Sequence, residues 1–227
     1  VLDTLRPSSP YGSERVRELR PFLPEERPEL ERQLSNIQRV LEGEAACQSA
    51  LNQLLRVFMT VKHIRPTVEK CLETSLNEIE LFEVKCFLLR CHEMLPLFQQ
   101  VQSALQWEGI GLEDTVQALD LLDPERNRVA SFFISDNSSP LLRSLRREKR
   151  ELEEQIRRLP AGEEREEVQA RRVRVASEEE LEEMRIRKEL SAALRPHVPA
   201  MLYNMEMIGE IDLTVEKARL ARRYGGV

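Results

Sequence analysis

Apolar positions recur every three or four residues through most of the first half of this chain, with polar residues between them. This spacing puts apolar side chains on one face of an α-helix and therefore predicts a series of amphipathic helices. Pro and Gly separate the series into segments, as they do at helix ends. The expected helices cover residues 13–20, 28–43, 46–62, 66–76, 77–107 and 114–122.

The longest expected helix, residues 77–107, has a wide apolar band, which is typical of a helix at the centre of a bundle. Asn77 is a good N-cap residue, and Pro96 is expected to bend the helix. Turn residues dominate the following stretch, residues 123–140. It is interpreted as a loop with one extended segment at residues 132–134.

A different pattern begins after Pro140. The apolar positions become a narrow seam close to a seven-residue repeat, and nearly every other position is charged. Such a helix needs one partner and is otherwise exposed to water; at about 1.5 Å per residue it is roughly 30 Å long. The seam consists of Leu142, Leu145, Leu152, Ile156 and Leu159.

The partner helix is expected to return along the first one. Ser177 and Glu180 fit a capping box, which predicts a helix start at Ser177. Pro196 and Pro199 predict a kink or a short break before the chain rejoins the bundle. Gly209, further along, is expected to permit a close approach between helices. The facing apolar positions are Leu181, Met184, Leu190 and Leu194.

Together these patterns predict an all-α protein, a helical bundle with a projecting antiparallel two-helix arm. Residues 1–139 and 190–227 form the bundle, and residues 140–189 form the arm, with a short tip at residues 160–176. Composition agrees, because 33% charged residues, 5% aromatic residues and only 8 glycines suit long helices with charged outer faces.

Charge and cysteine content narrow the possible functions. A net charge of −6 argues against nonspecific binding of nucleic acid by the whole chain. The sequence has neither an apolar run long enough to span a membrane nor a secretory signal pattern, so we expect a cytoplasmic protein with no membrane partner. Four cysteines lie among apolar residues and are expected to be buried, reduced thiols: Cys47, Cys71, Cys86 and Cys91.

The sequence lacks recognisable catalytic motifs. It contains no phosphate-binding loop, no His-Glu-x-x-His, no Cys-x-x-Cys and no Gly-x-Ser-x-Gly. Cys91 and His92 are adjacent, and adjacent residues of a helix do not face each other. We therefore expect no catalytic, cofactor-binding or metal-binding residues in this chain, and no enzymatic activity of its own.

Two groups of polar residues deserve separate interpretation. Arg171, Arg172 and Arg174 alternate with valines near the tip, which predicts a short strand, a basic patch that contacts DNA phosphates, or a solvated loop. Asp212 lies on or beside the apolar stripe of the last helix. It is either a buried carboxylate that accepts hydrogen bonds or a residue that signals to a neighbouring domain; we favour the first.

Long stretches of the chain resemble a known family. The segments "SPLLRSLRREKRELEEQIRR" and "RKELSAALRPHVPAMLYNMEMIGEIDLTVEKARLA" are similar to the core and lever region, domain III, of the MutS family of DNA mismatch repair ATPases. Residues 9–42, "SPYGSERVRELRPFLPEERPELERQLSNIQRVLE", resemble the branch that lacks the N-terminal mismatch-reading domain. The most specific part contains Glu210, Asp212 and residues 217–221.

This resemblance implies a non-catalytic module that mechanically couples an ATPase domain to DNA or partner binding, in mismatch repair or recombination. The ATPase domain, with its ATP and Mg²⁺, is expected after residue 227. The chain begins at Val1 and not at Met, so we expect it to be a piece of a longer protein. The full-length protein is expected to be a homodimer that contacts DNA. Asp212 and Lys217 would take part in domain coupling, and the short tip would be a remnant of the family's β-rich DNA clamp.

The residues also permit other functions. The arm could be a coiled-coil interaction or dimerisation module with no role in nucleic-acid binding, because its seam suits a partner helix. Alternatively, the arm tip could bind DNA directly through Arg171, Arg172 and Arg174, which would make binding strongly salt-dependent.

Overall fold

The computed structural model describes residues 4–225, and most of them lie in α-helices. Within these residues there is no strand, so the predicted all-α helical bundle is confirmed. In chain order the helices are α1 (Pro10–Arg17), the 3-10 helix η2 (Pro24–Glu26), α2 (Arg27–Phe58), α3 (Arg65–Glu73), α4 (Glu78–Leu105), α5 (Val116–Leu122), the 3-10 helix η3 (Asp136–Ser138), α6 (Pro140–Arg158), α7 (Glu163–Leu194), the 3-10 helix η4 (Arg195–His197) and α8 (Val198–Arg223).

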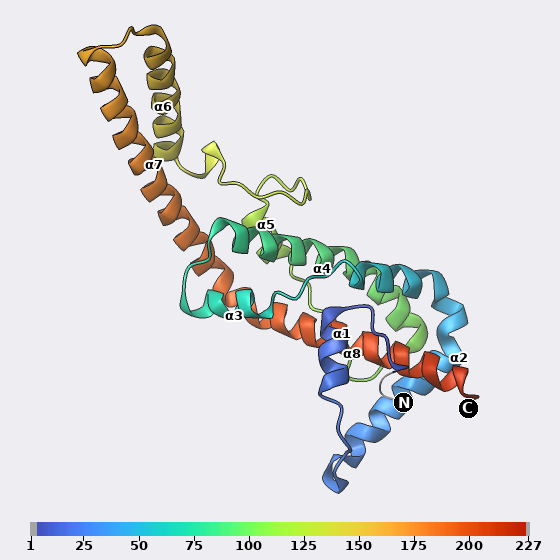
Figure 1. Ribbon diagram of the computed structural model, residues 1–227. Helices are drawn as coiled ribbons and strands as arrows, with labels where there is room; N and C mark the ends of the chain where they lie inside the picture. Colours follow the sequence, from blue (N-terminus) through green and yellow to red (C-terminus); the bar gives the residue numbers. More distant parts are fainter. Residues whose placement is uncertain (1–3, 226–227) are drawn as a thin grey trace.

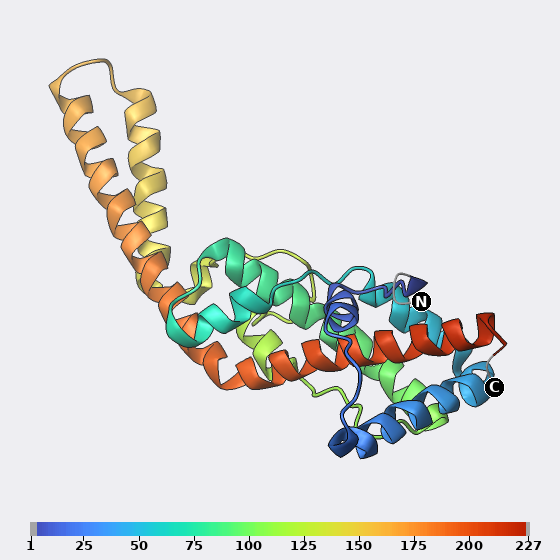
Figure 2. The same ribbon diagram turned by 60° about the horizontal axis from the view of Figure 1, so that its bottom comes forward.

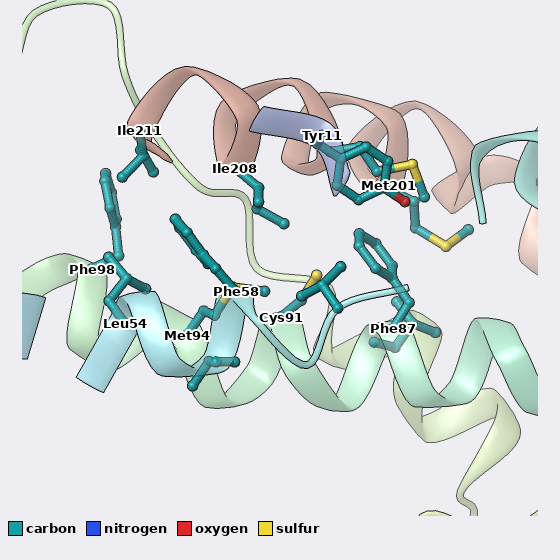
Figure 3. Close-up of a cluster of buried hydrophobic side chains, with 14 of the residues drawn as sticks. Tyr11, Leu54, Phe58, Phe87, Cys91, Met94, Phe98, Met201, Ile208 and Ile211 are labelled. Atoms are coloured by element: carbon teal, nitrogen blue, oxygen red, sulfur yellow. The ribbon is translucent and has the colours of Figure 1, made fainter. Parts of the chain in front are cut away.

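The bundle is built around α8, which packs against α1, α2 and α3, while α4 packs along α2. Helix α8 runs from the base of the arm to the far end of the bundle (Figure 2). One continuous apolar cluster fills the space between these helices. In Figure 3, Tyr11 from α1 and Phe58 from α2 lie between α8 above and α4 below.

Helix α4 begins where its sequence predicts. The Asn77 side chain accepts a hydrogen bond from the Glu80 backbone N–H at 2.9 Å, and the Glu80 carboxylate accepts one from the Asn77 N–H at 2.8 Å. This reciprocal capping satisfies two backbone donors that the first turn would otherwise leave free. Pro96 lies inside the helix, which continues to Leu105.

Helix α2 differs from the prediction, because Gly43 does not end a helix. The chain continues as one helix from Arg27 to Phe58. A Cβ atom on Gly43 would lie 2.8 Å from a methyl carbon of Leu105, at the end of α4. The glycine therefore permits a close approach of α2 and α4. Helix α2 remains continuous through this position.

Smaller differences occur at other boundaries. Helix α1 begins at Pro10, three residues earlier than expected, because Ser9 caps it and Pro is favoured in a first turn. Helix α4 ends before Trp107, where Gln106 adopts a left-handed conformation with φ of 50°. The expected extended segment at residues 132–134 has no regular structure, although Ile134 is buried.

Helices α6 and α7 pack side by side and form an arm that projects from one end of the bundle (Figure 1). Its tip is shorter than expected, because α7 already begins at Glu163 and the turn covers residues 159–162. Ser177 therefore does not start a helix. It lies inside α7, where its hydroxyl donates to the backbone carbonyl of Val173 at 3.2 Å.

Helix α7 leads directly into α8. The expected interruption near Pro196 is the single turn of 3-10 helix η4, so the predicted short break is confirmed. Further along α8, a Cβ atom on Gly209 would lie 2.8 Å from the carbonyl oxygen of Tyr11. This glycine permits the expected close helix approach, and its neighbour is α1. Among the described residues, no helix is long and apolar enough to cross a membrane.

Candidate functional site

The seam of the arm lies where its repeat predicts. Leu142, Leu145 and Leu152 are buried, and Ile156 and Leu159 are half-buried closer to the tip. Two small apolar clusters result, one at the base of the arm around Leu142 and one farther out around Leu145 and Leu152. Burial therefore decreases from the base of the arm to its tip.

The facing side of α7 differs from the prediction. Leu181 and Met184 are exposed, at 64% and 53% of their surface, so they do not belong to the interface. The side chains that do face α6 follow another stripe of the same helix. They are Val168, Val175 and Ile186. Leu190 packs against two apolar clusters, the one at the base of the arm and the main cluster of the bundle.

The three arginines near the tip lie on helix α7 and not on a strand. Arg171 pairs with Glu148 at 2.7 Å, and Arg172 pairs with Glu153 at 2.8 Å. Both carboxylates belong to α6, so these pairs connect the two helices of the arm. Arg174 is exposed. Contact with DNA phosphates would require Arg171 and Arg172 to leave their carboxylate partners.

Arg146 connects three segments at the base of the arm. From α6 it donates to the Ile134 carbonyl at 2.8 Å and to Asp136 at 2.6 Å, both in the preceding loop. It also pairs with Glu179 at 3.1 Å and Glu183 at 2.8 Å on α7. Because its guanidinium presents several donors in a fixed plane, Arg146 fixes the loop and both helices relative to one another.

A second polar contact lies beside it. Glu182 of α7 accepts a hydrogen bond at 2.6 Å from the hydroxyl of Ser139, the N-cap residue of α6, and pairs with Arg185 at 2.7 Å. The hydrogen bonds from Arg185 and Ser139 lower the pKa of Glu182 to about 2. The start of α6 is therefore held to α7 by a carboxylate that stays ionised across the physiological range.

Within the bundle, Asp212 anchors the N-terminal segment on α8. Its carboxylate is 2% exposed and accepts hydrogen bonds from the Ser8 N–H at 2.9 Å, the Ser9 N–H at 2.6 Å and the Ser9 hydroxyl at 2.7 Å. Burial raises the pKa of Asp212, although these donors oppose the shift. The interpretation of Asp212 as a buried, hydrogen-bonded carboxylate agrees with this geometry.

The segment around Asp212 has no room for larger side chains. A Cβ atom on Gly12 would lie 2.5 Å from an Asp212 carboxylate oxygen and 2.7 Å from the Pro7 Cβ. Nearby, the buried Tyr11 hydroxyl accepts a hydrogen bond from the Ile64 N–H at 3.2 Å, and burial raises the pKa of Tyr11 to about 12. The first helix is thus fixed to both α8 and the segment that precedes α3.

An ionic cluster continues this contact on the surface. Glu14 of α1 lies 2.5 Å from the His63 ring nitrogen, and Arg65 pairs with Glu206 of α8 at 2.7 Å. Arg65 also lies over the ring of Tyr11, at 5.8 Å from its centre.

Lys217, the second residue assigned to domain coupling, donates to the Gln33 side chain of α2 at 3.1 Å, and burial lowers its pKa.

Metal ligands and cysteine thiols are the remaining candidates for a chemical site. Within residues 4–225, no group of three or more His, Cys, Asp or Glu could hold a metal ion. All four cysteines are free; Cys47, Cys71 and Cys91 are buried, and Cys86 is partly exposed. Burial raises the pKa of Cys91 to about 12, which makes its thiol a poor nucleophile beside His92.

Comparison with known protein families found none that matches this chain, and comparison with curated proteins found no similar protein.

Some of the residues that organise these contacts were not identified from the sequence. Arg146 is one of many arginines in a highly charged segment, and no local pattern distinguishes it. Ser9 carries a recognisable signal, because a serine directly before a proline is typical of a helix N-cap followed by its first turn. Ser9 also donates a hydrogen bond to Asp212, about 200 positions away in the chain, and a contact over this distance has no local sequence pattern.

Proposed function

We propose that this chain is the core and lever region of a MutS-like protein of DNA mismatch repair or recombination. In this proposal the chain is not an enzyme. It transmits movement between an ATPase domain that follows it, which binds ATP and Mg²⁺, and DNA or a partner at the arm. The full-length protein acts as a dimer, as the family resemblance implies.

The observation that carries the proposal is the connection of the arm to α8. Helix α7 passes through the single turn η4 into α8, whose side chains are buried along most of its length. A rotation of α8 at the far end of the bundle therefore reaches the arm through one short connection, η4. A rod of roughly 30 Å that turns by about 5° moves its tip by roughly 2–3 Å.

The anchoring of α8 supports a switch with discrete positions. Asp212 fixes α8 to the N-terminal segment, and Lys217 joins it to α2. Packed interfaces of this kind change between alternative arrangements and do not stretch gradually. Movement of α8 would therefore shift the first helix and the arm together.

The test uses the full-length protein. Leu152→Asp places a charge in the buried seam of the arm and is expected to abolish the stimulation of ATPase activity by DNA while basal ATPase activity remains. Gln155→Asp, on the exposed side of the same helix, is the matched control and should keep the stimulation. If Leu152→Asp retains full stimulation although its arm is shown to be open, the arm does not couple the two events.

The alternative is an interaction or dimerisation module with no role in nucleic-acid binding. The observation that favours it is the exposed apolar surface of α7, which includes Val173, Leu181 and Met184. The seam leucines themselves face the partner helix of the same chain, so dimerisation would use this outer surface. Light scattering of the isolated chain, as wild type and as Leu181→Asp, tests whether it dimerises through this surface. A dimer that dissociates in the variant favours the interaction module, and a monomer in both excludes dimerisation through this surface.

A further inference from the structure

The last turn of helix α7 is attached to the bundle not only through its connection to α8. Residues 71–76, named here the α3–α4 corner, end helix α3 and lead to α4. Helix α3 packs against both α7 and α8, beside the junction of these two helices (Figure 1). The corner therefore lies where the arm helix enters the bundle.

Ser191 of α7 makes two hydrogen bonds to this corner, and it is completely buried. Its hydroxyl oxygen accepts a hydrogen bond from the Leu76 backbone N–H at 2.9 Å and donates to the Arg187 carbonyl at 2.8 Å. Its backbone carbonyl accepts from the Cys71 thiol, with 3.4 Å between oxygen and sulfur. Because buried polar groups that are all satisfied favour a single arrangement, Ser191 has one preferred position relative to the corner.

One turn further along, Arg195 of η4 adds another hydrogen bond, from its Nε atom to the Cys71 carbonyl at 3.0 Å. This carbonyl is among the last four of α3, which have no partner inside their own helix. Leu76, whose N–H is bound by Ser191, lies between α3 and α4 and is buried. Separating the corner from α7 and η4 would therefore leave backbone groups without partners, which is costly where they are buried.

These hydrogen bonds hold a short part of a long rod. Ser191 and Arg195 are separated by about 6 Å along the helix axis, whereas the arm helix extends roughly 42 Å from Ser191 back to its first residue, Glu163. A change of about 1 Å across the corner therefore moves the tip of the arm by roughly 7 Å.

Other contacts at the base of the arm are of a different kind. Ile186 of α7 packs against Ile134 and Leu142, and Arg146 donates to the loop at Ile134 and Asp136. Residues 123–139 of this loop contain no regular structure apart from η3. Apolar contacts have no fixed direction, and irregular loops adapt more easily than helices. These contacts can therefore follow a change in the direction of the arm without setting it.

We infer that the α3–α4 corner is the pivot that sets the direction of the arm relative to the bundle. The arm turns about Ser191 and Arg195, and the loop before α6 adjusts to the new direction. Because α3 also packs against α8, the corner gives α8 a second route to the arm, besides η4. The inference concerns the direction of the arm and does not depend on an ATPase domain.

The test measures the distance between a spin label at the arm tip and one on the bundle by pulsed electron paramagnetic resonance. The labels are attached to Glu164→Cys and Met59→Cys, at exposed positions, in a chain that carries Cys86→Ser, since the other native cysteines are buried. Ser191→Ala and Arg195→Met are each expected to shift or broaden the distance distribution by roughly 5–10 Å, because the corner no longer fixes α7. Arg195 is exposed, so its variant tests the pivot without disturbing the core.

Two further variants locate the pivot. Ser177→Ala is the matched control, because Ser177 makes the same hydroxyl bond to the carbonyl four residues earlier in α7, but lies in the arm, roughly 21 Å along the helix from Ser191. It should keep the wild-type distribution. Arg146→Met removes the contacts to the loop and should change the distribution less than either corner variant. Wild-type distributions in both corner variants at unchanged melting temperature, or a larger change in Arg146→Met, would overturn the inference.

Discussion

The bundle and the arm of this protein are both helical, but they are stabilised in different ways. The bundle has one continuous apolar core that joins helices from the whole sequence. The arm has two small apolar clusters, and its alignment depends on the ion pairs of Arg146, Arg171 and Arg172 and on the hydrogen bond from Ser139 to Glu182. Apolar burial contributes most of the stability of a fold, whereas exposed ion pairs contribute little stability. Their main effect is on the relative orientation of the helices that they join. The comparison suggests that the arm can open or tilt while the bundle stays folded.

The largest expected effect is in the bundle. Leu88 of α4 is fully buried in the main core, and Leu88→Ala is expected to lower the free energy of unfolding by about 2–5 kcal/mol. Urea denaturation followed by circular dichroism measures this change. Because the core is continuous, hydrogen exchange should rise in all bundle helices together. A rise confined to α4 would show that the bundle is not one cooperative unit.

A smaller and more local effect is expected in the arm. Leu152→Ala removes apolar contacts with Val175 and is expected to cost about 1–2 kcal/mol of arm stability. Hydrogen exchange resolved by residue should accelerate in α6 and in the facing part of α7, with α2 and α4 unchanged. If exchange in the bundle rises as much as in the arm, the two regions unfold together and the comparison fails.

The smallest expected effect is the loss of stability at the base of the arm at low pH. The pKa of Glu182 is lowered to about 2 in the folded protein, so the stability it contributes is present above its ordinary pKa, near 4.5, and is lost as pH falls toward about 2. Amides at the start of α6 should therefore exchange faster, relative to their intrinsic rates, as pH falls through this range. Glu182→Gln should reduce this pH dependence. An unchanged dependence in the variant would show that other carboxylates control the arm.

Much of the fold follows from local patterns. The N-cap of α4 at Asn77 and the break near Pro196 depend on neighbouring residues, and both could be predicted. Gly43 was misinterpreted because its role depends on Leu105, a residue of another helix. A glycine inside an amphipathic pattern marks a helix end or a close contact, and only the packing distinguishes these cases.

The facing side of α7 shows the same limit for the candidate site. Two stripes compete on this helix, one with Leu181 and Met184 and one with Val175, Glu182 and Ile186. The second is buried although it contains a carboxylate, because Glu182 finds Ser139 and Arg185 as partners. Hydrophobicity favours the first stripe, and only the three-dimensional arrangement of donors reveals the second. The capping-box pattern at Ser177 also predicted a wrong helix start. Helix α7 begins earlier, at Glu163, because α6 already packs against it before Ser177.

The contact between Asp212 and Ser9 also has a consequence for biosynthesis. The two residues are 203 positions apart in the chain, and the hydrogen bonds of Asp212 hold the segment that begins the first helix. During translation, Ser8 and Ser9 leave the ribosome long before their partner exists. At about 5–20 residues per second, this delay is roughly 10–40 seconds. Throughout this interval the apolar face of α1, including Tyr11, has no α8 to cover it, so this segment stays without its folded-state partner until α8 is made.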